Sequence, residues 1–185
     1  MGRAANSRAP ETEPGLPAGI LGRRLVKALG SRTMVAAESC TAGMVADLVA
    51  RIPGASRVLW GSYVTYMADA KLRALGLDAA ELEKFGPVSR ETACAMALGA
   101  LDRSGADYAV AVTGLAGPGG DGTAVPVGTV WIATAGRGRA PLARRFHFGG
   151  ARNEIRKRAA REALEALLTR ILLGDRDGSE VPSPV

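Results

Sequence analysis

Thr33-Met34-Val35-Ala36-Ala37-Glu38-Ser39-Cys40-Thr41-Ala42-Gly43 is the stretch of sequence on which the fold and the candidate chemistry depend. It begins as a short apolar strand and then passes into small hydroxyl and thiol side chains. Over residues 44–52, apolar residues recur at the spacing of one helix face. A strand therefore ends, and a helix begins, around Ser39, Cys40 and Thr41.

Two interpretations of this junction are open. The first turn of a helix carries backbone N–H groups without helical partners, together with the positive end of the helix dipole. Such a place suits an anion, or an oxygen that becomes negative during a reaction. Alternatively, Ser39 or Thr41 is only the N-cap of the helix, a role that serine and threonine favour.

Strand and helix patterns alternate along the rest of the chain, and a final pair of strands reads as a hairpin. Ser89 is expected to cap one of the helices. Since a hairpin adds antiparallel strands to parallel ones, this order predicts an α/β protein, a three-layer α/β/α sandwich with a mixed β-sheet. Besides the first strand, strands are expected over 58–66, 108–112, 127–135 and 142–148, and helices over 20–29, 44–52, 68–75, 79–84, 89–103 and 151–173.

The 185 residues are enough for one domain with a hydrophobic core. Residues 1–14, rich in Ala, Arg, Pro and Glu without periodicity, are expected to form a disordered leader. A single domain over 15–174 and a flexible polar tail over 175–185 complete the expected organisation. No apolar run approaches the ~18 residues of a membrane span, and the first 13 residues lack a signal-peptide pattern. A cytoplasmic location is therefore expected.

The formal net charge of +6 allows three interpretations. It is compatible with nucleic-acid binding, with a pocket for a small phosphorylated ligand, or with nothing more than solubility. The basic residues are spread out, except in 137–145 and 152–161, and aromatic residues, which stack on bases, are only 4% of the chain. Nucleic acid is therefore the less favoured partner.

The chain has a single histidine, His147, which a Ser-His-Asp triad would need. Because it alternates with Phe146 and Phe148 in a strand pattern, a structural or surface role is predicted. If Ser39 is a nucleophile, its base is then another residue, and a lysine can serve where burial or positive charge lowers its pKa. Lys71, one short helical stretch after the second predicted strand, is the candidate. A solvated surface lysine is the alternative interpretation.

The two cysteines, Cys40 and Cys94, form neither a disulfide framework nor a zinc site, and both are expected to be small buried residues. The sequence contains no Cys/His cluster that would indicate a metal.

Two further features could bind a ligand. The glycine-rich loop 113–122 follows a buried strand, where α/β proteins commonly place ligands. Arg152 and Arg156 lie four residues apart at the start of the last helix, so they share one face. With the helix N-terminus they would hold a phosphate. The alternative is a solvated basic helix face.

Taken together, six ordered motifs resemble those of one known family. Residues 37–43 are similar to its Ala-Glu-Ser-Cys-Thr-Gly/Ala-Gly motif. From about residue 18 to 173, the chain resembles the CinA C-terminal domain family, whose characterised members are nicotinamide-nucleotide amidases. The resemblance is to the stand-alone form, without the N-terminal nucleotide-pyrophosphatase-like domain of longer CinA proteins. The other motifs are Val64-Thr65-Tyr66 with Lys71, Gly86-Pro87-Val88-Ser89, Thr113-Gly114-Leu115-Ala116-Gly117-Pro118, Pro126-Val127-Gly128-Thr129-Val130, and Phe148-Gly149 with Arg152 and Ile155-Arg156.

The resemblance implies hydrolysis of nicotinamide mononucleotide to nicotinic acid mononucleotide and ammonia, in pyridine-nucleotide salvage, with no metal and no organic cofactor. It implies a Ser-Lys mechanism, in which Ser39 attacks the carboxamide carbon. Lys71 would take the serine proton and later help ammonia to leave. Tyr66 and Thr113 would lie close to this pair as positioning or proton-relay groups.

The resemblance also implies the groups that hold the substrate. Arginines at the start of the last helix would bind its 5′-phosphate, and backbone N–H groups around residues 39–41 and 114 are candidates for the oxyanion hole. Family members tend to form dimers or higher homo-oligomers with sites near subunit interfaces. The substrate-binding residues implied by motif position are Cys40, Thr41, Gly114, Gly117, Arg152 and Arg156.

One segment departs from the family pattern. Where the family often has Tyr-Ser-Asn-Glu, this chain has Tyr66-Met67-Ala68-Asp69, so two polar side chains are lost before Lys71. This departure and the basic charge support an alternative function. The chain would then be a non-catalytic nucleotide-binding or regulatory module, in keeping with the family's association with competence and DNA damage.

Overall fold

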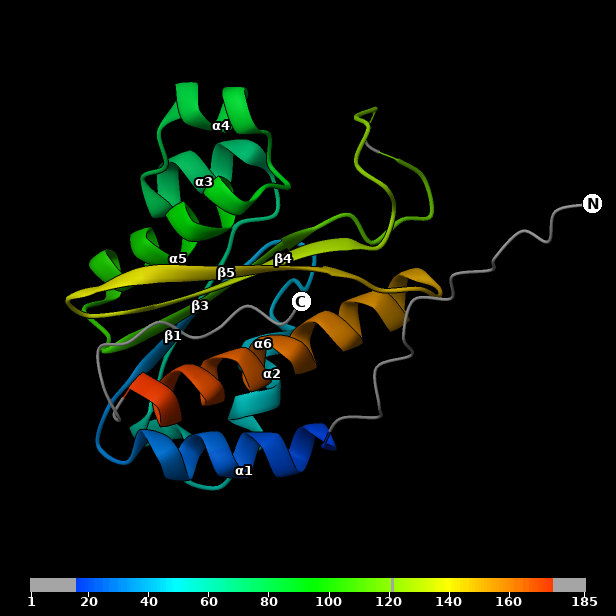
Figure 1. The fold of residues 1–185 in the computed structure, drawn as a ribbon. Helices are drawn as coiled ribbons and strands as arrows, with labels where there is room; N and C mark the ends of the chain where they lie inside the picture. Colours follow the sequence, from blue (N-terminus) through cyan, green and yellow to red (C-terminus); the bar gives the residue numbers. More distant parts are fainter. Residues whose placement is uncertain (1–15, 121, 175–185) are drawn as a thin grey trace, which may run out of the picture.

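Five strands and six α-helices, in the predicted order, make up the part of the chain that the structure describes (Figure 1). This computed structural model describes residues 16–120 and 122–174, so the leader predicted over 1–14 and the tail predicted over 175–185 lie outside it. The strands are β1 (Met34–Glu38), β2 (Leu59–Val64), β3 (Tyr108–Gly114), β4 (Thr129–Gly136) and β5 (Arg139–His147). The helices are α1 (Ala18–Leu29), α2 (Met44–Ala50), α3 (Ala68–Leu75), α4 (Ala79–Phe85), α5 (Arg90–Ser104) and α6 (Arg152–Gly174), with a 3-10 turn at Ala55–Arg57.

The sheet is mixed, as predicted, and its strand order is β2-β1-β3-β4-β5. β1 lies between β2 and β3 and is parallel to both, whereas β4 is antiparallel to β3 and to β5. The carboxyl ends of β1, β2 and β3 therefore lie side by side at one end of the sheet. Side chains that follow these strands are neighbours in space although they are far apart in sequence.

Helices cover both faces of the sheet, which confirms the predicted three-layer sandwich. α1, α2 and α6 lie on one face, and α3, α4 and α5 lie on the other (Figure 1). Met34 and alternate residues after it pack with leucines of α1 and α6, whereas Val35 and alternate residues after it pack with alanines of α5. Because side chains alternate along a strand, Glu38 belongs to the α2 face and Ser39 continues the row on the α3 and α5 face.

Helix α3 lies directly against α5 at Gly99. A Cβ atom added to Gly99 would lie 2.3 Å from the carbonyl oxygen of Leu75, the last residue of α3. Only glycine permits so close an approach of two backbones. Since Lys71 lies one turn before Leu75, this approach helps to set the position of Lys71 over the sheet.

Two helix ends illustrate where the sequence prediction holds and where it fails. Ser89 caps α5 as predicted, because its Oγ accepts a hydrogen bond of 3.1 Å from the N–H of Thr92. The helix after Ser39 is shorter than the predicted 44–52, since α2 ends at Ala50. Pro53 disfavours a helical conformation in the residue before it, and Gly54 adopts a left-handed φ of 89°.

Candidate active site

Ser39 and Lys71 lie in contact beneath the surface, at the carboxyl ends of β1 and β2. Lys71 Nζ lies 3.1 Å from Ser39 Oγ, and it also donates to the carbonyl oxygens of Thr65 at 2.8 Å and Tyr66 at 3.4 Å. The side chain of Lys71 is buried, with 1% of its surface exposed. The interpretation of Lys71 as a solvated surface residue is therefore wrong.

The surroundings of Lys71 favour its neutral form. Burial lowers the pKa of Lys71 to about 8, although the nearby Cys40 acts in the opposite direction. A neutral amine that donates its two protons to the Thr65 and Tyr66 carbonyls presents its lone pair to the third neighbour, the Ser39 hydroxyl. The geometry thus fits a base beside a hydroxyl nucleophile.

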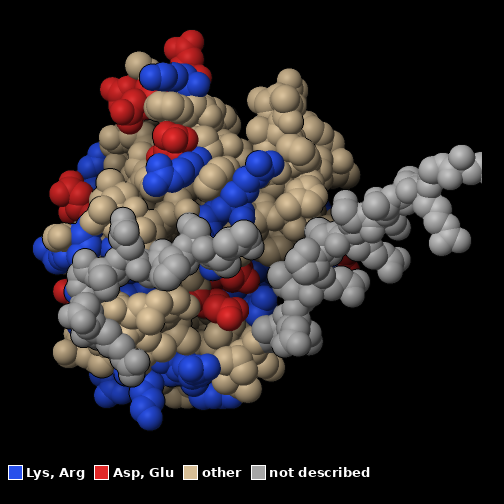
Figure 2. All heavy atoms as spheres, viewed as in Figure 1, with Lys and Arg blue, Asp and Glu red and all other residues tan. Residues whose placement is uncertain are grey.

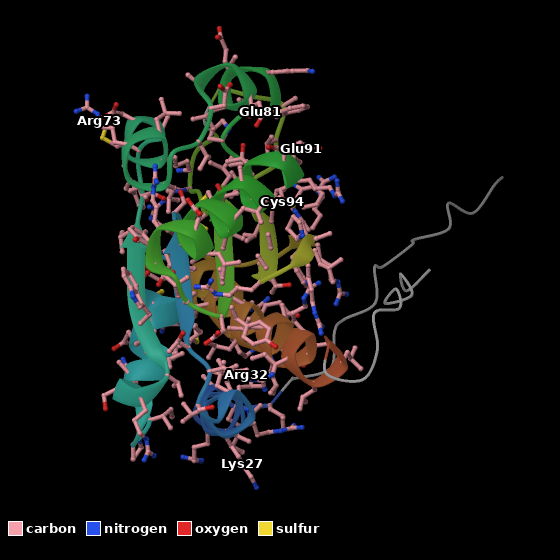
Figure 3. The ribbon with its side chains drawn as sticks, turned by 90° about the vertical axis from the view of Figure 1, so that its left-hand side faces the viewer. Lys27, Arg32, Arg73, Glu81, Glu91 and Cys94 are labelled. Atoms are coloured by element: carbon pink, nitrogen blue, oxygen red, sulfur yellow. The ribbon has the colours of Figure 1, made fainter. Side chains whose placement is uncertain are left out.

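Cys40, the residue after Ser39, is buried as predicted, whereas Cys94 on α5 is half-buried (Figure 3). Burial raises the pKa of the Cys40 thiol to about 11, despite the opposing effects of a backbone N–H and of Arg156. The thiol is therefore protonated at neutral pH and does not compete with Ser39 as a nucleophile. His147 is exposed at the end of β5, in line with the predicted surface role.

The turn from Ser39 to the start of α2 is held by the carboxylate of Glu38. Glu38 is fully buried, and its Oε2 accepts from the N–H groups of Gly43 at 2.9 Å and Val45 at 3.1 Å. Its Oε1 accepts from the N–H of Ala46 and the hydroxyl of Ser62, both at 3.0 Å. The first-turn N–H groups of α2 are therefore already paired, and they are not the anion site that the sequence suggested.

The interpretation of Ser39 or Thr41 as an N-cap is also wrong. The N-cap of α2 is Gly43, and no side chain of the cap residue bonds to the helix. Sequence reasoning assigned no role to Glu38, although one signal was present. An ionisable residue ends an otherwise apolar, fully buried strand, and such a group is buried only when it is hydrogen-bonded.

Thr113 and Tyr66 lie on either side of Ser39, Thr113 near the end of β3 and Tyr66 two residues after the end of β2. The N–H of Ser39 donates to the carbonyl of Val112 at 2.9 Å, so Thr113 is its neighbour on β3. The buried Thr113 hydroxyl donates to the carbonyl of Pro87 at 2.6 Å, which ties the loop before α5 to this end of the sheet. Tyr66 is half-exposed, and its hydroxyl accepts a hydrogen bond from Arg152.

The two arginines of α6 reach the same end of the sheet and make different contacts. Arg152 is exposed and bridges two loops, since it donates to the Tyr66 hydroxyl and to the carbonyl of Gly117. Arg156 is half-buried and donates to the carbonyls of Cys40 at 2.9 Å and Thr41 at 3.1 Å. Arg152 thus lies at the rim, whereas Arg156 supports the turn after Ser39.

The predicted glycines lie at the start of the loop that follows β3. A Cβ atom on Gly114 would lie 2.7 Å from the carbonyl oxygen of Thr129, so this position packs against the first residue of β4. Gly117 has a left-handed φ of 75° and accepts the bond from Arg152. Both glycines therefore let the loop backbone run close to its neighbours.

Three threonine hydroxyls at this end of the sheet are buried and lack a hydrogen-bond partner among the described residues: those of Thr41, Thr65 and Thr129. Buried polar groups are nearly always paired, so orphaned ones need an explanation. They lie in the turn after Ser39, just after β2, and at the start of β4. Sequence reasoning did not single out Thr65 or Thr129, because a hydroxyl's lack of partners is visible only in the fold.

Figure 2 shows charged side chains of both signs on one face of the molecule. On the face shown in Figure 2, lysine and arginine side chains are interspersed with acidic and uncharged residues. Within residues 16–120 and 122–174, no helix combines the length and apolar character that crossing a membrane requires.

The chain is a three-layer α/β protein. Its buried serine–lysine pair, at the carboxyl ends of parallel strands, is a candidate hydrolytic site. The family model of the CinA C-terminal domain matches residues 20–171. The chain belongs to the CinA C-terminal domain family.

Similar proteins support this assignment. A CinA-like protein from Mycolicibacterium vanbaalenii is 44% identical over 151 residues, which are 82% of this chain and 36% of that protein. A CinA-like protein from Akkermansia muciniphila is 46% identical over 132 residues, which are 71% of this chain and 32% of that protein. The chain spans about a third of the length of the curated relatives that it matches.

Solved structures show the same fold. The competence/damage inducible protein CihA from Agrobacterium tumefaciens has a TM-score of 0.80 and 42% identity, over 86% of this chain and 98% of that chain. A CinA superfamily protein from Klebsiella pneumoniae has a TM-score of 0.82 and 31% identity, over 85% of this chain and 99% of that chain.

Proposed function

We propose that this protein is an amidohydrolase that converts nicotinamide mononucleotide to nicotinic acid mononucleotide and ammonia. The observation that carries the proposal is the buried contact of 3.1 Å between Lys71 Nζ and Ser39 Oγ. A serine hydroxyl is a weak nucleophile until an adjacent base takes its proton, and a buried lysine with a lowered pKa is such a base. The choice of nicotinamide mononucleotide as substrate rests on the motifs that the chain shares with the family's nicotinamide-nucleotide amidases.

In the proposed reaction, Ser39 Oγ attacks the carboxamide carbon while its proton moves to Lys71 Nζ. The C–N bond of the tetrahedral intermediate then breaks, and the proton on Lys71 passes to the leaving nitrogen, which departs as ammonia. Water attacks the resulting ester and gives a proton to Lys71. The ester C–O bond breaks, the proton returns to Ser39, and the carboxylic acid is released.

The negative oxygen of the intermediate would be stabilised by backbone N–H groups beside the nucleophile. Among the described residues, no oxygen accepts a hydrogen bond from the N–H of Cys40 or of Thr41. Both residues are buried, and the N–H of Cys40 meets only the sulfur of its own side chain, which is a weak acceptor. Buried N–H groups without a strong acceptor are rare. These two groups, with Gly114 across the site, are the proposed oxyanion hole.

Binding of the nucleotide is proposed for the rim of the site. The 5′-phosphate would lie at Arg152 and at Nη1 of Arg156, whose other two nitrogens keep their bonds to the carbonyls of Cys40 and Thr41. Arg152 would exchange its bonds to Tyr66 and Gly117 for bonds to phosphate oxygens. Tyr66 would then be free to contact the substrate, and Thr113 would keep the flanking loop in place through Pro87.

The direct test is to incubate the purified protein with nicotinamide mononucleotide and to measure ammonia and nicotinic acid mononucleotide together. The proposal expects the two products in equal amounts. Nicotinamide riboside, which has the same carboxamide but no phosphate, is the matched control and is expected to react with a much higher KM. Absence of ammonia at high enzyme concentration would sink the proposal.

We also propose that the protein is a homo-oligomer. β2 is an edge strand of the sheet, and its exposed side chains include the large apolar residues Trp60 and Val64, with Met67 close behind. Exposed apolar groups on an unpaired edge favour association with a second copy. Light scattering after size exclusion is expected to give at least twice the 19.1 kDa chain mass, and a monomer would contradict this.

A non-catalytic nucleotide-binding or regulatory module is the second candidate function. It is favoured by the segment Tyr66-Met67-Ala68-Asp69, which lacks two polar side chains of the family pattern, and by the formal net charge of +6. The description of the Agrobacterium relative as competence/damage inducible agrees with it. It predicts a rise in melting temperature with nicotinamide mononucleotide and no ammonia.

A further inference from the structure

The turn between Ser39 and α2 has a conformation that its own residues do not favour. Ala42 has a φ of 50° and Gly43 a φ of 94°. The left-handed region is unfavourable for any residue with a Cβ atom, so an alanine there must be held by contacts outside the turn.

Glu38 provides the contacts on one side of this turn. Its two carboxylate oxygens accept from the N–H groups of Gly43, Val45 and Ala46, and from the hydroxyl of Ser62 on β2. Because Glu38 directly precedes Ser39, the same residue ends the strand and fixes where α2 begins. Its full burial means that water does not compete for these bonds.

Arg156 provides the contacts on the other side, through the carbonyls of Cys40 and Thr41. The carbonyl oxygens of residues 40 and 41 and the N–H groups of residues 43, 45 and 46 are therefore all paired. The N–H groups of Cys40 and Thr41 remain. Neither donates to an oxygen atom of the residues that the structure describes.

We propose that Glu38 is the positioning residue of the reaction: through the turn, it fixes the N–H groups of Cys40 and Thr41 as donors to the developing oxyanion. The inference rests on the proposed amidase function. Glu38 itself touches no reacting atom. Because an oxyanion hole acts mainly in the transition state, loss of this positioning lowers kcat and leaves KM almost unchanged.

Glu38→Gln is the test variant, since glutamine keeps the size of the side chain but turns an amide NH2 toward backbone N–H groups. Asp107→Asn is the matched control. Asp107 also accepts two hydrogen bonds, from the N–H of Thr33 at 2.7 Å and from its hydroxyl at 3.0 Å, but at the opposite end of β1. Each variant is measured by steady-state ammonia release and by thermal melting.

The expected result for Glu38→Gln is a kcat about 100-fold lower, with KM within about threefold of the unmodified protein. Asp107→Asn is expected to melt at a lower temperature with kcat within about twofold of the unmodified value. If Glu38→Gln does not fold, Ser62→Ala removes one of the four bonds and is expected to lower kcat several-fold at constant KM. Equal kcat losses in Glu38→Gln and Asp107→Asn, or a loss wholly in KM, would overturn the inference.

A second readout separates this inference from the choice of substrate. A small sulfonyl fluoride labels a serine when an O–S bond forms, fluoride leaves and the base takes the serine proton, and the rate depends on oxyanion stabilisation. If the unmodified protein releases no ammonia, the proposed function fails, and labelling of Ser39 decides the inference. Faster labelling of the unmodified protein than of Glu38→Gln supports it, whereas equal rates, or no labelling of Ser39, overturn it.

Discussion

The two ends of β1 and β3 are built from the same strands and differ in how their polar groups are paired. At the amino ends, Asp107 accepts from the N–H and hydroxyl of Thr33, and these bonds lower the pKa of Asp107. Arg137 donates to the carbonyl of Ala106 at 3.0 Å, and Arg32 to the hydroxyl of Tyr108 at 3.1 Å. Figure 3 looks onto this end of the molecule, with Arg32 labelled beside α1.

At the carboxyl ends, polar groups are buried with fewer partners. The hydroxyls of Thr41, Thr65 and Thr129 have none among the described residues, and the amine of Lys71 is buried at a depressed pKa. The fourth orphaned atom, Arg170 Nε, belongs to a guanidinium that still donates to Ala140 through Nη2. One end of the strands thus favours stability, whereas the other tolerates a loss of stability, as functional sites commonly do.

Among variants of the groups around Ser39, the largest expected effect comes from Lys71→Met, which removes the buried amine. Ammonia release is expected to fall by about 10³-fold or more, because the base is lost. Stability at pH 7 is expected to rise, since holding the pKa near 8 rather than 10.5 corresponds to about 3 kcal/mol against the folded state. Urea unfolding measures the change in stability. A Lys71→Met protein that is less stable than the unmodified one would show that burial of the amine does not destabilise the folded state.

Arg152→Ala tests the rim of the carboxyl end and is expected to have the next largest effect. Removing a charged donor to phosphate is expected to raise KM for nicotinamide mononucleotide by about 10- to 100-fold with little change in kcat. Nicotinamide riboside, which has no phosphate, serves as the control and is expected to react equally with both proteins. A KM that stays constant would remove Arg152 from the phosphate site.

The pH dependence of the reaction is expected to follow Lys71. Because its amine must be neutral to act as base, kcat/KM is expected to rise about tenfold from pH 7 to a plateau above pH 8. Stability changes in the same direction. Between about pH 8 and pH 10.5 Lys71 binds more protons in the unfolded chain than in the folded one, so its contribution to stability rises with pH. Above about pH 9 the Cys40 thiol, whose pKa burial raises to about 11, acts in the opposite direction, so the net rise is expected between about pH 8 and pH 9. A flat rate profile from pH 6 to 9 would argue against Lys71 as the base.

The smallest expected effect concerns the helix that carries Lys71. α4 and α5 have side-chain caps at Asp78 and Ser89, whereas Met67, the N-cap of α3, makes no such bond. Met67→Ser is expected to stabilise the protein by about 0.5–1 kcal/mol in urea unfolding. Met67→Ala is the control, and equal stability of the two variants would show that the cap does not form.

Sequence patterns predicted most of the strands and helices that form the three layers, because the signals for these elements are local. Apolar periodicity, the Ser89 cap and the glycines after the helices each depend on a few neighbouring residues. The contacts of the site depend on the fold instead. Lys71 meets a serine 32 positions away, and Arg156 reaches the Cys40 carbonyl across 116 positions. Only a family resemblance linked these residues in advance, and it did not extend to the role of Glu38 or to the unpaired hydroxyls of Thr65 and Thr129.

Ammonia release from nicotinamide mononucleotide by the unmodified protein and by Ser39→Ala is the decisive measurement for the Ser39–Lys71 pair. We expect robust release from the unmodified protein and none from the variant, at an unchanged melting temperature. Release by a folded Ser39→Ala protein would show that this pair does not perform the chemistry.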